Sequence, residues 1–208
     1  DNQPAAGQVW RWWIAAGALV GIGLTVHYQF VIVPLGAGLF LLTTVTGRSL
    51  LRQRGPWLAV VCALPGLIPI LWFNMNHNLA GLEFQFMDRH PWRYDASGWR
   101  FWEDQLLATS PLLYGACLAS AGHGLLRSKR TQHPDSARLL SLFGLSHILV
   151  FGLLSPWMDQ QRTNVHWPLL GYLPLLVFLP GILRNSMGQM QRVALWLLAI
   201  TAGATSLG

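Results

Sequence analysis

The chain has 208 residues, of which 52% are hydrophobic and 11% are charged, and its mean hydropathy is +0.38. Soluble globular domains carry about 25% charged residues, so this composition excludes a soluble domain and predicts an integral membrane protein. The formal net charge is +6. Because the basic residues lie in short loops between apolar segments, they favour contact with the bilayer surface, and no nucleic acid is expected as a partner.

The first apolar region, 10–46, is too long for a single membrane crossing. Its 37 residues would extend about 55 Å as one helix, whereas a bilayer core is about 30 Å thick. We expect the chain to turn at the polar triplet His-Tyr-Gln at 27–29. Two helices, 10–26 and 30–46, then meet near one membrane face.

Five further apolar runs are long enough to cross a bilayer, which needs about 20 helical residues. The fold class is therefore predicted as all-α, a polytopic membrane protein in which 1–208 form a single transmembrane domain of about seven helices. Cys62 and Cys117 lie inside apolar runs, so we expect small core residues rather than a disulfide. The glycines of GALVGIG indicate close helix packing in lipid. The five runs are 57–73, 105–126, 138–156, 167–183 and 193–207.

The charged residues sort onto alternate loops, which predicts the orientation. Ten of the fourteen basic residues lie before the first span or in the loops near 48–54, 127–138 and 184–192. Six of the eight acidic residues lie in the other two loops, 74–104 and 157–166. By the positive-inside rule the basic set is cytoplasmic, and 74–104 and 157–166 are two extracytoplasmic loops.

The loop 74–104 is long for a connector and mixes charges with aromatic residues, which is typical of functional loops. Apolar side chains near its end are interrupted by Arg100, Glu103 and Asp104. This spacing predicts an amphipathic helix lying on the outer leaflet. A helix start with acidic residues in its first turn is the alternative.

Polar residues concentrate where this loop leaves the membrane, in the stretch WFNMNHNLAGLEFQFMDRH at 72–90. Asn74 and His77 sit at the depth of lipid headgroups, whereas Asn76 and Asn78 are typical of helix capping. Glu83 and Gln85 alternate with apolar residues, so both would face one side if the segment is extended. An arginine at 89 has the planar fork of donors that binds a phosphate, or it pairs with a neighbouring carboxylate.

The second outer loop offers a similar set before the chain re-enters the membrane at Trp167. Arg162, Asn164 and His166 lie there within five residues. Together the two loops suit an anionic lipid headgroup bound where the bilayer meets water. The histidines and acids of 77–90 lack the spacing of a metal site, so no metal and no cofactor is predicted.

Several motifs resemble those of the GT-C superfamily, the membrane glycosyltransferases that use polyprenyl-phosphate sugars. The resemblance is to the branch of protein O-mannosyltransferases and bacterial lipid A aminoarabinose transferases, and it covers nearly the whole chain. It departs at His27, where the family often has lysine, at Leu79, where it often has tryptophan, and at His166, where it often has asparagine. The positions that fit are Pro69, Trp72, Asn74, His77, Phe84, Gln85, Arg89, Trp167, Pro168 and Tyr172.

The resemblance implies an enzyme that transfers a sugar from a polyprenyl-phosphate donor to a lipid, glycan or protein acceptor. The acidic base of the family lies in the first extracytoplasmic loop, upstream of this chain, so the catalytic residue is unknown and we expect the chain to be inactive alone. It begins at Asp1 and stops inside an apolar run, as a C-terminal piece would. The residues expected to bind donor are His27, Asn74, His77, Glu83, Gln85, Arg89, Arg162, Asn164, His166, Trp167 and Tyr172.

The leading hypothesis is therefore a glycosyltransferase of the cell envelope, in the bacterial cytoplasmic (inner) membrane, with its active face extracytoplasmic. A polytopic transporter or lipid flippase is one alternative, and it predicts ionisable residues buried in the middle of the spans. A non-catalytic membrane protein of envelope assembly is the other. An acid in the first outer loop of a longer parent chain would favour the enzyme.

Overall fold

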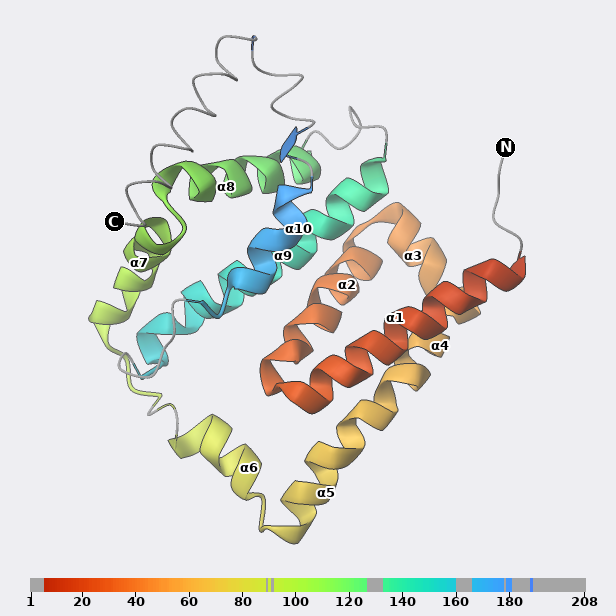
Figure 1. The fold of residues 1–208 in the computed structure, drawn as a ribbon, viewed down its shortest axis with the longest axis horizontal. Helices are drawn as coiled ribbons and strands as arrows, with labels where there is room; N and C mark the ends of the chain where they lie inside the picture. The colour runs from red at the N-terminus through yellow and green to blue at the C-terminus, as the bar shows by residue number, and fades with distance from the viewer. Residues whose placement is uncertain are drawn as a thin grey trace, which may run out of the picture.

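The computed structural model describes residues 6–88, 90, 92–126, 133–159, 166–177, 179–180 and 188. These residues form helices and the turns between them, with no strand in this part of the chain, as Figure 1 shows. The predicted class of all-α membrane protein is confirmed. Its long helices lie side by side, and short helices connect them at the two ends.

The chain turns at His27, as the polar triplet predicts. Helix α1 (Ala6–Val26) ends there, and a 3-10 turn η1 (Tyr28–Val31) leads into α2 (Ile32–Thr43). His27 has an extended backbone (φ −153°, ψ 131°), and its Nδ1 accepts a hydrogen bond of 3.2 Å from the backbone N–H of Gln29. The histidine therefore ends one helix and caps the next.

The second predicted helix, 30–46, is shorter than expected. Thr44 is extended and ends α2 at Thr43, after which α3 (Val45–Leu51) continues at an angle of 104°. The Thr44 hydroxyl donates to the Phe40 carbonyl and accepts from the Gly47 N–H, both at 2.9 Å. Because one hydroxyl satisfies backbone groups of both helices, the bend is capped from both sides.

The third span is continuous in space although it has three parts. Helix α4 (Arg54–Ala63), the 3-10 turn η2 (Leu64–Leu67) and α5 (Ile68–Asn76) together form one apolar segment of 23 residues. It runs parallel to α1, and a Cβ added to Gly17 or Gly66 would come within 2.2 Å of the opposite backbone. The glycines of α1 thus permit the close helix packing predicted from the sequence.

The predicted span 105–126 is wrong at its start. Helix α7 (Phe101–Ala108) ends first, and α8 (Pro111–Leu126) begins at a proline. Ser110 between them has φ 64°, and a residue before proline avoids the α region. The apolar run therefore holds two helices.

Before α7 the first outer loop contains α6 (Ala80–Glu83), a π-helical turn η3 (Phe84–Asp88) and a 3-10 turn η4 (Ala96–Arg100).

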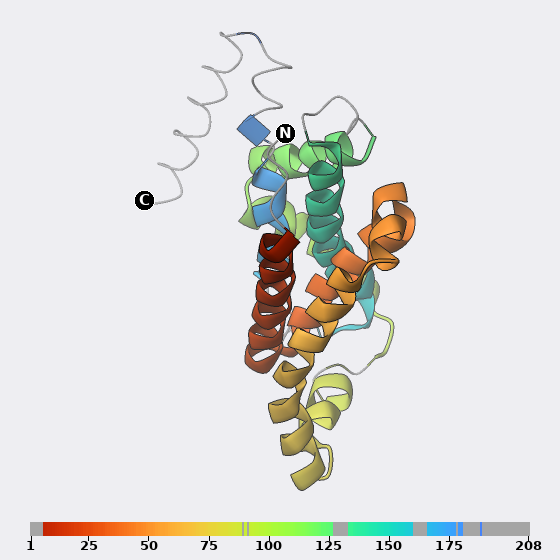
Figure 2. The same ribbon diagram turned by 90° about the vertical axis from the view of Figure 1, so that its right-hand side faces the viewer.

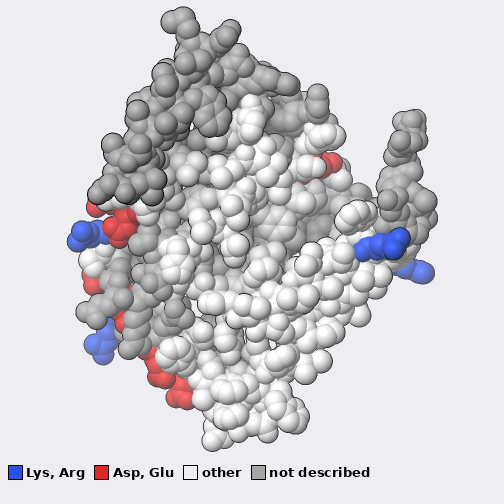
Figure 3. Space-filling model, viewed as in Figure 1, with Lys and Arg blue, Asp and Glu red and all other residues white. Residues whose placement is uncertain are grey.

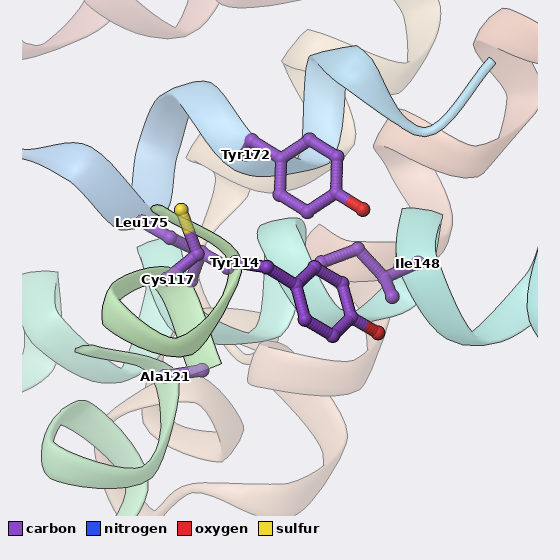
Figure 4. Packing of buried hydrophobic residues seen from close by; sticks show 6 residues of the cluster. All are labelled: Tyr114, Cys117, Ala121, Ile148, Tyr172 and Leu175. Carbon is purple, nitrogen blue, oxygen red and sulfur yellow. The ribbon is translucent and has the colours of Figure 1, made fainter. Parts of the chain in front are cut away.

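The remaining helices form a second bundle around α9 (Pro134–Leu154). The turn η6 (Ser155–Trp157) follows it, and α10 (Leu169–Leu176) returns antiparallel to it, within the predicted span 167–183. A Cβ added to Gly144 of α9 would lie 2.4 Å from the Leu175 side chain and 2.6 Å from the Gly171 carbonyl oxygen, so α9 and α10 approach closely there. The predicted last span, 193–207, lies outside the described residues. The core drawn in Figure 4 joins α8, α9 and α10 through Tyr114, Cys117, Ala121, Ile148, Tyr172 and Leu175.

The helix directions agree with the predicted alternation of loops. Helix α2 lies between the two bundles and runs antiparallel to α9, because Gly36 meets Phe143 and Ile32 packs near Phe151. Three helices are long and apolar enough to span a membrane, within 9–26, 54–76 and 134–157, and the bent pair α2–α3 is a fourth if it forms one span.

The acidic side chains are concentrated on one side of the molecule. In Figure 3 most of them lie along the left edge, over the segment from α6 to α7, where basic side chains also lie among them. Basic side chains stand at the right edge, near the start of α1 and of α4. This arrangement agrees with the positive-inside assignment.

Candidate functional site

Asn74 of α5 links the turn η1 to helix α6 in the loop 74–104. It is 2% exposed, and its Nδ2 donates to the Ile70 carbonyl at 2.8 Å and lies 3.5 Å from the Tyr28 hydroxyl. Its Oδ1 accepts from the Leu82 N–H at 2.9 Å. A Cβ on Gly81 would lie 2.7 Å from that tyrosine hydroxyl. Asn74 is thus a positioning residue that fixes α6 and η1 against α5.

Two imidazoles come from the segments that Asn74 joins. His27 precedes Tyr28 and is exposed, and His77 is exposed at the C-terminal end of α5. The His77 ring stacks on Phe73 with centroids 4.3 Å apart, and its Nδ1 lies 2.9 Å from the Phe73 carbonyl oxygen. Both histidines can therefore present a ring nitrogen to a ligand at the outer face.

The expected alternation of Glu83 and Gln85 is wrong, because the segment is helical rather than extended. Glu83 ends α6 and is exposed, whereas Gln85 lies in the π-helical turn and is half-buried. Successive side chains of a helix point about 100° apart, so two residues separated by two do not share a face. Asn78 and Leu79 start this helix with φ of 51° and 63°.

The two outer loops meet at His90, which sequence reasoning had weighed only as a metal ligand. His90 is 7% exposed, and its ring meets the edges of Trp92 and Trp167 at centroid distances of 5.8 and 6.2 Å. Its Nδ1 lies 3.4 Å from the backbone N–H of Asp159. Trp167 also packs on Phe151, at 5.5 Å. In the sequence, the aromatic residues around position 90 were the feature that could have indicated this contact between the two loops.

Tyr172 points into the protein rather than to the outer surface. It is 4% exposed, and its hydroxyl donates to Oε1 of Gln105 at 2.7 Å. Gln105 is completely buried and comes from α7, inside a stretch that reads as apolar. His166 is exposed, and its carbonyl accepts from the Leu169 N–H at 3.0 Å at the start of α10.

The predicted residues form two groups rather than one. His27, Asn74 and His77 lie where α1 and α5 end and α2 begins. Trp167 and Tyr172 lie on the second bundle, and Trp167 belongs to the buried cluster that also holds Ile32 at the start of α2. Figures 1 and 2 both show α5 and α6 extending away from α10. Arg89, Arg162 and Asn164 lie outside the described residues.

The junction of the outer loops has one perturbed carboxylate. Hydrogen bonds from Ser97, chiefly from its backbone N–H to the Asp95 carboxylate at 2.8 Å, lower the pKa of Asp95. Within the described ranges, no three His, Cys, Asp or Glu residues gather closely enough to hold a metal ion. Cys62 and Cys117 are both free thiols, as predicted.

Comparison with known proteins gives one match. Residues 5–73 are similar to the family described as dolichyl-phosphate-mannose-protein mannosyltransferase. The matched stretch covers α1 to most of α5, including the His27 turn. No curated protein and no solved structure matches the chain. The match indicates a membrane glycosyltransferase of the mannosyltransferase kind.

Proposed function

We propose that the protein transfers a sugar from a polyprenyl-phosphate donor to an acceptor on the extracytoplasmic side of a bacterial cytoplasmic membrane. The observation that carries this proposal is the mannosyltransferase match over 5–73, whose helices hold the exposed His27. The aminoarabinose transferase branch, suggested by the sequence, remains part of the proposal. So does an upstream acidic residue as catalytic base.

The exposed imidazoles of His27 and His77 suit the phosphate of the donor. A protonated imidazole or its N–H donates a charge-assisted hydrogen bond to a phosphate oxygen. Asn74 supports this arrangement because it fixes the turn that carries His27 against the helix that carries His77. Arg89 and Arg162 are proposed to add bidentate contacts. Asn164 and His166 remain proposed substrate contacts.

The lipid tail of the donor has a candidate position on the same helices. A groove of about 310 Å³ lies between α1 and η2 and reaches Thr25, two residues before His27. Its lining is mostly small or apolar, so a hydrocarbon chain fits it without leaving polar groups unpaired. The lining residues are Ala18, Gly21, Ile22, Thr25, Cys62, Pro65 and Gly66.

The proposed reaction exchanges one bond for another at the anomeric carbon. The acceptor oxygen forms a bond to this carbon while the bond to the phosphate oxygen breaks, and polyprenyl phosphate leaves. The acceptor proton passes to the upstream base. Cationic groups at the phosphate stabilise the negative charge that develops on the leaving oxygen, which lowers the barrier.

The proposal is tested by binding of a short-chain prenyl phosphate to the protein in lipid nanodiscs. We expect Arg89→Ala and Arg162→Ala to weaken binding about tenfold each, because one charge-assisted contact corresponds to about 1.4 kcal/mol. Arg52→Ala, an exposed arginine at the opposite end of the molecule, should bind normally. Unchanged binding in both loop variants, or no transfer of mannose or aminoarabinose from a polyprenyl-phosphate donor by the full-length parent protein, would refute the proposal.

One observation favours the transporter alternative. His147 is 4% exposed in the middle of α9, and its Nε2 has no hydrogen-bond partner within the described residues. Ser120 and Ser141 of the same bundle share this property. Ionisable groups buried in spans often mark transport paths. Movement of a prenyl-phosphate lipid between leaflets in liposomes, abolished in His147→Leu, would favour transport over transfer.

A further inference from the structure

Three aromatic side chains form an exposed corner where the outer loops meet. The rings of Tyr94 and Trp157 are 5.5 Å apart at 61°, so one stands on the edge of the other. Trp99 donates from Nε1 to the Tyr94 hydroxyl at 3.3 Å. Tyr94 is 60% exposed, Trp99 42% and Trp157 37%. We call Tyr94, Trp99 and Trp157 the aromatic platform.

The backbone under the platform is fixed. The Asp95 N–H donates to the Pro156 carbonyl at 2.7 Å, which ties the segment before η4 to η6. Gly98 packs so closely on η6 that an added Cβ would lie 2.5 Å from the Pro156 Cα. The backbone segments that carry the three rings are therefore held together without a ligand, so binding needs little ordering of the backbone.

Charged residues are neighbours of the platform along the chain, and the exposed Leu153 and Leu154 precede Trp157. Arg93 and Asp95 flank Tyr94, and Arg100 follows Trp99, and all three are exposed. Glu103 and Asp104 are exposed one turn further on. Two arginines and three carboxylates give a net charge of −1, which neither enters hydrocarbon nor attracts anionic headgroups. A membrane-interface role alone does not account for this combination.

A pyranose ring has the complementary chemistry. Its axial C–H bonds are weakly positive and pack on the negative faces of aromatic rings. Its hydroxyl groups donate to carboxylates and accept from arginines around the ring. A corner of two rings offers a floor and a wall for one sugar. The platform thus combines both kinds of contact that a saccharide uses.

We propose that Tyr94, Trp99 and Trp157 form a saccharide-binding site at the junction of the two outer loops. The inference deepens the proposed function by naming a pyranose ring as the group that this surface receives. The ring belongs either to a glycan acceptor or to the sugar of the donor. The platform residues are binding residues and take no part in bond making.

The test measures binding of mannotriose to the protein in lipid nanodiscs by saturation-transfer NMR. We expect Tyr94→Ala and Trp157→Ala each to weaken binding about tenfold, or about 1.4 kcal/mol. Trp57→Ala is the matched control, because Trp57 is 58% exposed on α4 and its Nε1 likewise donates to an oxygen, the Leu51 carbonyl. Circular dichroism checks that each variant is folded.

A second arm separates the two sources of the sugar. If the ring comes from the donor, the platform variants lose affinity for mannosyl prenyl phosphate but keep affinity for prenyl phosphate. If it comes from an acceptor glycan, they lose affinity for mannotriose only. Either result supports the site. No saccharide binding by the unmodified protein, or equal binding by Tyr94→Ala, Trp157→Ala and Trp57→Ala, would overturn it.

A membrane role has its own signature. With fluorotryptophan incorporated and the Trp99 signal assigned through Trp99→Phe, strong broadening by a nitroxide on the lipid chains would place the ring in the bilayer and overturn the inference. Failure of the proposed function looks different. Saccharide binding that depends on the platform, without mannose transfer by the full-length parent, would refute the transferase and leave the site standing.

Discussion

The buried hydrogen bond between Tyr172 and Gln105 gives a sharp test of how the second bundle is held together. Tyr172→Phe removes only the hydroxyl that donates to Gln105 Oε1 at 2.7 Å, and both side chains are buried. Interhelical hydrogen bonds in membranes contribute about 0.6–1.7 kcal/mol. Loss of one donor to a buried carbonyl costs about 1–3 kcal/mol. We therefore expect Tyr172→Phe to lower the free energy of unfolding by about 1–2 kcal/mol.

Equilibrium unfolding in mixed detergent micelles, followed by near-ultraviolet circular dichroism, measures this change. Tyr114→Phe is the matched control: Tyr114 is 8% exposed in the same core, its ring lies 6.2 Å from that of Tyr172, and its hydroxyl makes no hydrogen bond in the described part of the chain. The double variant Tyr172→Phe with Gln105→Leu should lose less free energy of unfolding than the two single variants together, because each single variant already removes the Tyr172–Gln105 hydrogen bond.

If Tyr172→Phe and Tyr114→Phe unfold at the same denaturant concentration, the reasoning about the Tyr172–Gln105 hydrogen bond is refuted. A second outcome bears on the predicted role of Tyr172 in substrate binding. If Tyr172→Phe is as stable as the unmodified protein but binds prenyl phosphate more weakly, the hydroxyl serves the ligand rather than the core. The buried geometry leads us to expect the reverse.

Three further changes test other contacts. Gly66→Ala should destabilise the protein by about 1–3 kcal/mol, since its Cβ would lie 2.1 Å from a carbonyl oxygen of α1, whereas Gly38→Ala, with open space around it, should not; thermal unfolding compares them. Asn74→Ala should speed amide hydrogen exchange in α6, because the Leu82 N–H loses its acceptor, and Asn76→Ala, which removes a bond within α5, should not. The folded-state pKa of Asp95 is lowered, so its stabilisation is present above the unfolded pKa and lost as pH falls through the folded one. The protection of the η4 amides, meaning their exchange rate relative to the intrinsic rate at the same pH, should therefore fall in acid, and Asp95→Asn should abolish that change in protection.

The outer face shows where sequence reasoning reached the site and where it failed. His27, Asn74 and His77 were selected because polar residues are conspicuous where an apolar span ends, and the structure places Tyr28, next to His27, beside Asn74. Asn74 and Tyr172 do not face a ligand, because in the structure both are buried and hydrogen-bonded to other parts of the protein. Their partners, Leu82 and Gln105, are 8 and 67 residues away along the chain.

The sequence by itself determined the fold class, the turn at His27 and the direction of the helices. These follow from hydropathy and from the placement of charges, because a bilayer imposes both on any chain that crosses it. The resemblance in its motifs also agrees with the match over 5–73.

Only the tertiary structure decided which residues meet. The break between α7 and α8, the helical form of 80–88 and the contact of η4 with η6 depend on backbone conformation and packing between distant segments. Hydropathy does not predict these features, since a bent helix buries nearly the same apolar surface as a straight one. The aromatic platform depends on the contact of η4 with η6, in which Pro156 accepts a hydrogen bond from Asp95, 61 residues earlier in the chain, and Gly98 packs on Pro156.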